Sequence, residues 1–403
     1  MKDRVIEIRS SAEAKKLLAE IGAYKASFNI MAPKAILRIL YLKDIPFAIC
    51  NVLKQEMLSV GGEAAVSKGV VSARDKKSDC LIIGNLPQIK NLILKLKKQP
   101  PAFSGISYRI ERLLGNYQKK FLEFRCRNFK LNLNQKTYIM AVLNVTPDSF
   151  SDGGQFFDEE KAFERALQLE KEGADIIDIG GQSTRPGAKE INFKEEIRRV
   201  LPIIKRLRRR IKIPISIDTY KFGVAKAALE EGASILNDIY GLRRDRRLAK
   251  LAAKFKAGVV LMHIKGTPRF MQRKPYYKDL MGDIIDSLSQ SIDLALNAGI
   301  SEKNIVVDPG LGFGKTVKHN LSVIKNLSQL RSLGCPVLIG PSRKSFIGKT
   351  LHLPIGERLY GTIASVCACV LRGADIVRVH DVAYTKQAIK IIDEILRSPN
   401  CSK

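Results

Sequence analysis

The stretch Tyr138-Ile-Met-Ala-Val-Leu143 decides the fold, because an entirely apolar run ends abruptly at a polar residue, Asn144. Similar runs recur through the rest of the chain. They are Asp175–Ile179, Pro214–Ile217, Ser234–Leu236, Gly258–Met262, Asn304–Val307, Pro336–Ile339 and Asp375–Val379. Short, nearly all-apolar runs of this kind are typical of strands buried on both faces of a parallel sheet.

Segments of helical period separate these runs, for example Glu159–Gly173, Lys194–Arg210, Tyr220–Gly232 and Ile284–Gly299, and several of them close at a glycine. Eight strand–helix units in succession predict an α/β fold, a (β/α)8 TIM barrel, over residues 136–399. A doubly wound open sheet is the structural alternative. It would need fewer strands and a topological switch point, so the eight-fold repeat favours the barrel.

Residues 1–130 predict a smaller α/β domain at the N-terminus. Lys54–Val70 reads as a helix, Leu81–Ile83 as a short strand and Leu86–Lys98 as an amphipathic helix. Phe103–Leu133 reads as a segment, partly helical, that connects to the barrel. No catalytic constellation is found in this region, so its role is not assigned.

The formal net charge of +29 suggests anionic ligands or nucleic acid, and the excess of lysine and arginine is densest in the N-terminal third. The basic residues are spread along helical patterns, which favours solvated helix faces over a nucleic-acid surface. A basic nucleic-acid-binding module in residues 1–130 remains the alternative from a different functional class. Its binding would fall steeply with salt.

No apolar stretch reaches the roughly 18–20 residues that a membrane-spanning helix needs, so we expect no membrane association. The chain has seven cysteines, and none forms a C-x-x-C pair. Scattered cysteines in odd number are typical of free thiols in a reducing cytoplasm, so a cytoplasmic location is expected.

Polar residues close every apolar run, which is where a barrel of this kind places its catalytic groups. The longest of these segments are Asn144–Gly154, Gly180–Gly187, Asp308–Gly314, Gly340–Ser345 and Arg378–Asp381. The remaining runs end at Asp218, at Asn237-Asp238 and at His263. Polar groups at all eight strand ends predict one functional site at the mouth of the barrel.

Asp218, Asn237, Asp308 and Lys344 would together present acceptors and donors in an apolar cup. A carboxylate accepts two parallel hydrogen bonds from an amino-pyrimidinone edge, and an amide offers a mixed pair. This set predicts a flat, nitrogen-rich heterocycle as the ligand. An ion pair between Asp308 and Lys344 without a ligand is the structural alternative.

Arg185, Lys344, Arg378 and His380 would gather several negative charges beside that ring, which predicts a diphosphate. The oxygen of Asn144 would be available to a Mg²⁺ ion that bridges the diphosphate oxygens. Gly310-Leu-Gly-Phe-Gly314-Lys-Thr lacks the spacing of a P-loop, so nucleotide hydrolysis is not favoured. His263 could instead cap its strand, and Asp238 could be a turn residue.

These motifs closely resemble those of dihydropteroate synthases, over roughly Tyr138–Arg397. The long matches are Asn144–Gly154, Gly180–Gly187, Ile339–Gly348 and Arg378–Val382. The resemblance implies a transferase of folate biosynthesis that condenses 6-hydroxymethyl-7,8-dihydropterin diphosphate with 4-aminobenzoate and releases diphosphate. It also implies that the protein is a homodimer.

The resemblance carries specific roles onto this chain, position by position. Pterin would contact Asp218, Asn237, Asp308, Gly340 and Lys344. The metal would contact Asn144, and the diphosphate would contact Arg378 and His380. The region of the diphosphate and aminobenzoate would include Thr184, Arg185 and Ser345, with Ser345 at a helix N-terminus. The walls of the aminobenzoate pocket would be Phe150 and Pro186.

In the implied mechanism, diphosphate leaves, Asp152 stabilises the resulting pterin cation and the neutral arylamine attacks, with positioning and electrostatics lowering the barrier. Catalytic roles therefore fall to Asp152, Lys344, Arg378 and Asn144. Gln182 departs from the glutamate more often expected in the family. A pterin-dependent methyltransferase on the same barrel is the closer alternative, but it has no use for Ser342–Ser345 or Arg378–His380.

Overall fold

The structure, a computed structural model, describes residues 3–8, 10–72, 74–121, 123–146, 155–183, 185 and 187–398. The chain divides into two compact units, the first comprising Met1–Asn116 with Asn400–Lys403 and the second Tyr117–Pro399. The boundary falls inside the last turn of helix α6 (Ser104–Gln118). Within the described residues, no helix combines the length and apolarity needed to cross a bilayer.

The second unit is built around one eight-stranded parallel sheet, in the order β11-β10-β9-β8-β7-β6-β13-β12. A parallel bridge between Val307 and Val337 joins the two ends of that order and closes the barrel. The strands are β6 (Tyr138–Asn144), β7 (Ile176–Gly180), β8 (Ile215–Asp218), β9 (Ile235–Asp238), β10 (Gly258–Met262), β11 (Ile305–Asp308), β12 (Leu338–Ile339) and β13 (Ile376–Val379).

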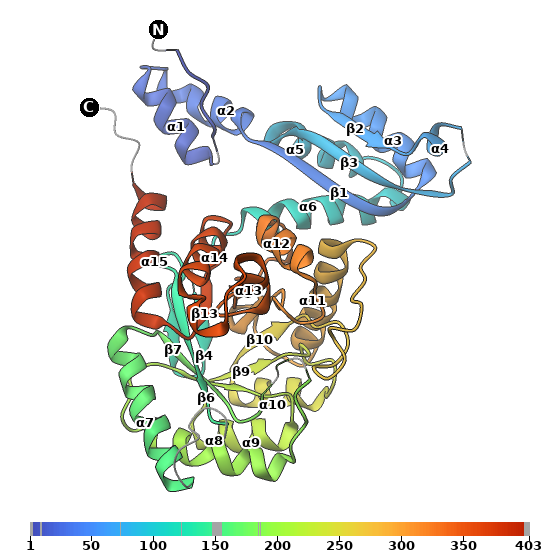
Figure 1. The fold of residues 1–403 in the computed structure, drawn as a ribbon. Helices are drawn as coiled ribbons and strands as arrows, with labels where there is room; N and C mark the ends of the chain where they lie inside the picture. Colours follow the sequence, from blue (N-terminus) through green and yellow to red (C-terminus); the bar gives the residue numbers. More distant parts are fainter. Residues whose placement is uncertain are drawn as a thin grey trace. The chain divides into compact units, whose positions relative to one another are not determined.

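Helices follow the strands and surround the barrel (Figure 1). They are α7 (Gln155–Glu172), α8 (Phe193–Leu207), α9 (Phe222–Glu231), α10 (Arg247–Phe255), α11 (Leu280–Asn297), α12 (Val317–Lys325), α13 (Ser345–Leu351), α14 (Leu359–Leu371) and α15 (Val382–Arg397). Short 3-10 turns lie at Glu302–Asn304, Leu327–Leu333 and Ile355–Glu357. The predicted (β/α)8 barrel is confirmed, and the open-sheet alternative is excluded.

A small hairpin, β4 (Phe124–Cys126) and β5 (Phe129–Leu131), closes the amino-terminal end of the barrel. Fully buried Phe124 packs in one cluster with the lowest inward residues of the strands, Tyr138, Ile176 and Ile376 among them. A Cβ at Gly258 would lie 2.5 Å from the Phe124 ring, so the glycine makes room for the phenylalanine. The connecting segment expected at Phe103–Leu133 is therefore a helix followed by a hairpin that belongs to the barrel.

The first unit has a three-stranded antiparallel sheet in the order β1-β3-β2, formed by β1 (Leu37–Pro46), β2 (Glu63–Val66) and β3 (Lys77–Asn85). Its helices are α1 (Ser11–Glu20), α2 (Phe28–Met31), α3 (Phe47–Ser59), α4 (Lys68–Val71), α5 (Leu86–Leu96) and α6. Its core includes Leu42, Leu53, Ile82 and Ile89.

The predicted strand at Leu81–Ile83 and the predicted helix from Leu86 are confirmed. The helix expected over Lys54–Val70 is wrong in its second half. Helix α3 ends at Ser59 and a turn at Gly61, with φ +76°, leads into β2. Exposed and more buried positions alternate along β2 with a strand period, and Ala64 lies in the core.

Candidate active site

Strand periodicity aims a ring of polar side chains into the mouth of the barrel. The lowest layer of inward residues is apolar. Two positions further along, the same inward face carries Asp178 in β7, Asn237 in β9, Met262 in β10, Asp308 in β11, Gly340 directly after β12 and Arg378 in β13. Because side chains alternate between the two faces of a strand, these residues also point into the barrel.

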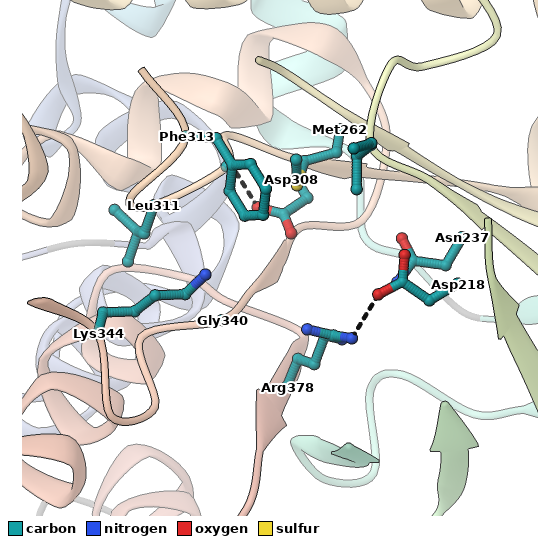
Figure 2. Close-up of a pocket in the computed structure, with 11 residues that line it drawn as sticks. Asp218, Asn237, Met262, Asp308, Leu311, Phe313, Gly340, Lys344 and Arg378 are labelled. Atoms are coloured by element: carbon teal, nitrogen blue, oxygen red, sulfur yellow. Dashed lines mark hydrogen bonds and ion pairs between the residues drawn. The ribbon is translucent and has the colours of Figure 1, made fainter. Parts of the chain in front are cut away.

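A small, partly enclosed cavity lies at the mouth of the barrel. Figure 2 shows the labelled side chains arranged around it, with Asp218 and Asn237 on one side, Lys344 opposite and Asp308 between them. The lining residues are Asp218, Asn237, Ile239, Met262, Asp308, Gly310, Leu311, Phe313, Gly340, Lys344 and Arg378. The cavity therefore brings together the four residues expected to hold a heterocycle.

Arg378 joins two carboxylates at the floor of the cavity. Its Nε donates to Oδ2 of Asp178 at 2.6 Å, and its Nη2 donates to Oδ2 of Asp218 at 2.7 Å. Asn237 Nδ2 also donates to Asp178 Oδ2, at 3.0 Å. Charge-assisted bonds of this kind fix the planar guanidinium, so Arg378 is oriented before any ligand arrives.

Two oxygens at this floor are buried without a hydrogen-bond partner, namely Asp178 Oδ1 and Asp218 Oδ1. Burial raises the pKa of Asp218 against the opposing charge of Arg378, and nearby Asp178 raises it further. A buried acceptor without a partner is costly, so both oxygens favour a ligand that brings N–H donors.

Lys344 faces the acidic floor from the opposite side of the cavity. Its Nζ lies 4.5 Å from the centroid of the Phe313 ring, a cation–π distance. Burial and the charge of Arg378 lower the pKa of Lys344 to about 8, against the attraction of Asp308 and Asp218. Among the described residues, no ion pair joins Lys344 to Asp308, so the expected structural alternative is not found.

Asp308, the last residue of β11, also belongs to this floor, and the loop that follows it fixes one of its carboxylate oxygens. Asp308 Oδ1 accepts a hydrogen bond from Gly310 N at 2.7 Å, which leaves Oδ2 for a ligand. Burial raises the pKa of Asp308. Gly310 has φ +67°, and a Cβ there would lie 2.1 Å from the carbonyl oxygen of His263, so only glycine fits.

Lys315 stabilises the loop after β11 through hydrogen bonds. It is buried, and its ammonium group donates to the carbonyl oxygens of Gly310 at 3.0 Å and Phe313 at 3.2 Å. Its Nζ also lies 2.9 Å from Nδ1 of His263, which must be the unprotonated nitrogen if the ammonium donates to it. Burial and Lys315 lower the pKa of His263 to about 2. His263 thus anchors the loop after β11.

Two further residues lie at the rim. Asn144 occupies an inward position of β6, and His380 is the residue directly after β13. Asn144 Oδ1 and Asp218 Oδ2 both lie within 4 Å of the point where a Cβ of Gly180 would stand. His380 pairs through Nδ1 with Ser342 Oγ at 3.0 Å. Burial and Arg378 lower the pKa of His380 to about 3, so its imidazole is neutral near pH 7 and offers a hydrogen bond but no charge.

The other expected rim residues are less enclosed. Arg185 is exposed, and its charge contributes to the lowered pKa of Lys344. Ser345 is exposed and is the first residue of α13. The remaining expected site residues lie outside the described residues, namely Phe150, Asp152, Thr184 and Pro186.

Sequence reasoning missed Asp178 and Lys315. Asp178 was read as part of an apolar strand, although a lone carboxylate in a strand buried on all sides signals a partner across the barrel. Lys315 follows a glycine-rich loop without the P-loop spacing, and its role needed the tertiary fold. The turn interpretation of Asp238 is confirmed, since its carboxylate accepts from Tyr240 N at 2.9 Å and Leu242 N at 2.7 Å.

Comparison with known proteins agrees with this geometry. The family described as pterin binding enzyme matches residues 140–380. A dihydropteroate synthase of Clostridium beijerinckii is 46% identical over 66% of this chain and 97% of its own length.

Two solved structures are similar over the barrel. A dihydropteroate synthase of Clostridium difficile, solved in the presence of pteroic acid, is 46% identical with a TM-score of 0.63 and covers 66% of this chain and 98% of its own. A dihydropteroate synthase of Xanthomonas albilineans with 4-aminobenzoic acid is 39% identical with a TM-score of 0.65 and covers 70% and 100%. The chain described here belongs to the pterin-binding enzyme family and, within it, to the dihydropteroate synthases, the transferases of folate biosynthesis.

Proposed function

We propose that the cavity binds the pterin ring of 6-hydroxymethyl-7,8-dihydropterin diphosphate and that the barrel mouth condenses it with 4-aminobenzoate, releasing diphosphate. The observation that carries this proposal is the acidic floor, in which Asp218 Oδ1 is buried without a hydrogen-bond partner. The amino group and ring N–H of a pterin are donors spaced to meet such a carboxylate.

Each wall of the cavity then has a role in holding the ring. Asp218 and Asp308 accept from the pterin N–H groups, Asn237 contributes a mixed amide pair, and Lys344 donates to a carbonyl oxygen or ring nitrogen. Gly340 leaves space on one side, where a Cβ would lie 3.5 Å from Cβ of Arg378. Met262 and Phe313 supply apolar contact.

The leaving diphosphate would lie toward the rim. Nη1 is the guanidinium nitrogen of Arg378 that neither Asp178 nor Asp218 uses, so it can donate to an anion. His380 contributes a neutral hydrogen bond there. These groups stabilise charge that grows as the carbon–oxygen bond breaks, which lowers the barrier without a strong base.

Mg²⁺ would be held at this rim through the amide oxygen of Asn144, which lies on the same side of the mouth as Asp218, both within 4 Å of the point where a Cβ of Gly180 would stand. Among the described residues, no cluster of three or more His, Cys, Asp or Glu could hold a metal by protein groups alone. One protein oxygen completed by diphosphate oxygens and water is a coordination that Mg²⁺ commonly accepts. When bound, the ion would neutralise charge on the leaving diphosphate.

The acceptor, 4-aminobenzoate, would enter from the rim where Arg185 and Ser345 lie. The Xanthomonas albilineans relative, solved with 4-aminobenzoic acid, supports this ligand. The carboxylate of the acceptor would pair with Arg185 and Ser345, and Thr184, Phe150 and Pro186 would complete its pocket. Asp152 would stabilise the pterin cation before the neutral amine attacks.

The proposal includes a homodimer, and the apolar face of the last two helices supports it. Tyr360 of α14 and Tyr384, Ile391 and Ile395 of α15 are 83%, 58%, 62% and 59% exposed. Large exposed apolar side chains on neighbouring helices are typical of an interface between subunits. Light scattering should give twice the chain mass, and Ile391→Asp should give the monomer. A monomeric wild type would contradict this assembly.

The activity is tested by incubating the purified protein with Mg²⁺, the pterin diphosphate and 4-aminobenzoate, followed by mass spectrometry. Dihydropteroate and diphosphate should form together in equal amounts. A folded protein that consumes neither substrate would refute the proposal. Methyl transfer from a methylated pterin would instead favour the alternative enzyme on the same barrel.

A further inference from the structure

The segment that joins β7 to α8, residues 181–192, carries Arg185 and is closed at its base by one amide side chain. Gln182, at the start of the segment, accepts a hydrogen bond through Oε1 from Ile191 N, at its end, at 3.1 Å. The side chain at the start of the loop is thus hydrogen-bonded to the backbone at its end.

Lys221 reinforces this closure from the neighbouring strand end. Its ammonium group donates to Gln182 Oε1 at 2.6 Å, to the carbonyl oxygen of Ile191 at 2.6 Å and to Glu196 Oε2 at 2.7 Å. The side chains of Lys221 and Glu196 are only 12% and 2% exposed. An ammonium group has three protons, so these three acceptors use all of them.

The amide nitrogen of Gln182 makes a different connection. Its Nε2 donates to the hydroxyl oxygen of Tyr220 at 2.8 Å. Burial raises the pKa of Tyr220 to about 12; the bond from Gln182 opposes this rise, and the nearby negative charge of Glu190 adds to it. Arg244 lies over the Tyr220 ring at 4.5 Å and donates to Glu190 at 3.2 Å.

The observed hydrogen bond runs from the Gln182 amide to the Tyr220 oxygen, so the Tyr220 proton is available to another acceptor, and the nearby Glu190 carboxylate can serve as one. A carboxylate at position 182 has no proton to give, so it would compete with Glu190 for the single Tyr220 proton. It would also place a second carboxylate beside Glu196 on Lys221. The ion pair between Glu190 and Arg244 is exposed, so it would then stabilise that end of the loop only weakly.

We propose that Gln182 is a positioning residue whose amide, acting through Tyr220 and Lys221, fixes the 182–191 loop and so places Arg185 for the carboxylate-bearing acceptor. This inference rests on the proposed function, because the acceptor is the substrate named there. It predicts that the direction of the hydrogen bonds is what matters. The side chain at position 182 need not be a glutamine, as long as the residue at position 190 is changed so that the donors and acceptors around Tyr220 still match.

The test compares Gln182→Glu with the double variant Gln182→Glu/Glu190→Gln. In the single variant, the KM for 4-aminobenzoate should rise about five- to ten-fold, the effect of about one lost hydrogen bond. The KM for the pterin diphosphate and kcat should stay within about two-fold, and amide hydrogen exchange over residues 183–191 should accelerate. The double variant reverses the chain of donors, since the new amide at position 190 can donate to Tyr220 and Tyr220 can donate to the new carboxylate at position 182. It should therefore restore both readouts.

Gln329→Glu, on an exposed turn, is the charge-matched control and should behave as the wild type. An unchanged KM and unchanged exchange in the single variant would overturn the inference, and so would a double variant as impaired as the single one. If the wild type forms no dihydropteroate, the proposed function fails, while the exchange rates still decide whether Gln182 fixes the loop.

Discussion

Arg378 donates from Nη2 to Oδ2 of Asp218 at 2.7 Å, so the cation expected for the leaving group is tied to a carboxylate expected for the pterin. The same guanidinium holds Asp178. The residues expected to bind the pterin ring and those expected to bind the leaving diphosphate are therefore not separate parts of the site. Any change at Arg378 should affect stability as well as diphosphate binding.

Arg378→Met should destabilise the protein by about 3–5 kcal/mol near pH 8, because two buried carboxylates lose their partner. Arg378 opposes the raised pKa of Asp218, so its removal raises that pKa further above the unfolded value. A raised folded-state pKa gives stability at low pH that is lost as pH rises. Urea denaturation should therefore show a deficit that grows from pH 5 to pH 8. Arg372→Met, at an exposed helix end, is the control, and a deficit independent of pH would contradict this account.

The pKa of Lys344 should determine how the rate of the reaction depends on pH. Burial and Arg378 lower it to about 8, so the ammonium donor is lost as pH rises through that value. We expect kcat/KM for the pterin diphosphate to fall above about pH 8, approaching ten-fold per pH unit. Lys344→Gln should have low activity without this alkaline limb, whereas Lys349→Gln, on the exposed side of α13, should keep it. An alkaline limb that persists in Lys344→Gln would assign it to another group.

Residues 1–116 should be dispensable for the chemistry, since a curated relative is matched over 97% of its length by only 66% of this chain. A chain that starts at Tyr117 keeps the β4–β5 hairpin and should retain kcat within about two-fold. A chain that starts at Asn134 loses buried Phe124 and should be less stable by about 3–5 kcal/mol. An inactive but folded Tyr117–Lys403 chain would show that the first unit takes part in catalysis.

The basic charge of the first unit leaves the nucleic-acid alternative open to a direct test. Binding of the full chain to a labelled DNA duplex should be weak at about 150 mM salt if the lysines are only a solvated surface. A specific affinity that falls steeply with salt, and is lost in the chain starting at Tyr117, would favour the alternative.

Most of the barrel could be predicted from the sequence, because a strand buried on both faces leaves a run such as Tyr138–Leu143 that little else produces. The positions of Asp218, Asn237 and Asp308 followed from the same logic, since each ends its run. The hairpin at Phe124–Leu131 could not be foreseen, because its partners, such as Ile376, are far away in the sequence.

The ion pairs of Arg378 also could not be predicted from the sequence. Arg378 was expected to meet a diphosphate, yet its first partners are Asp178 and Asp218, which only the closed barrel brings near. The neutral state of His380 has the same origin, because burial and Arg378 together lower its pKa. From the sequence, Gln182 stood out only as a departure from the glutamate more often expected in the family, and its network with Lys221 and Tyr220 became visible only in the structure.

The central claim is that the acidic floor holds the pterin ring, and calorimetry with free 6-hydroxymethyl-7,8-dihydropterin tests it most directly. Asp308→Asn keeps the size of the side chain but removes a charged acceptor, so affinity should fall by at least about 100-fold while thermal unfolding changes little. Asp381→Asn, which faces Arg343 and not the cavity, should bind as the wild type does. Equal affinity in Asp308→Asn and the wild type would contradict the account.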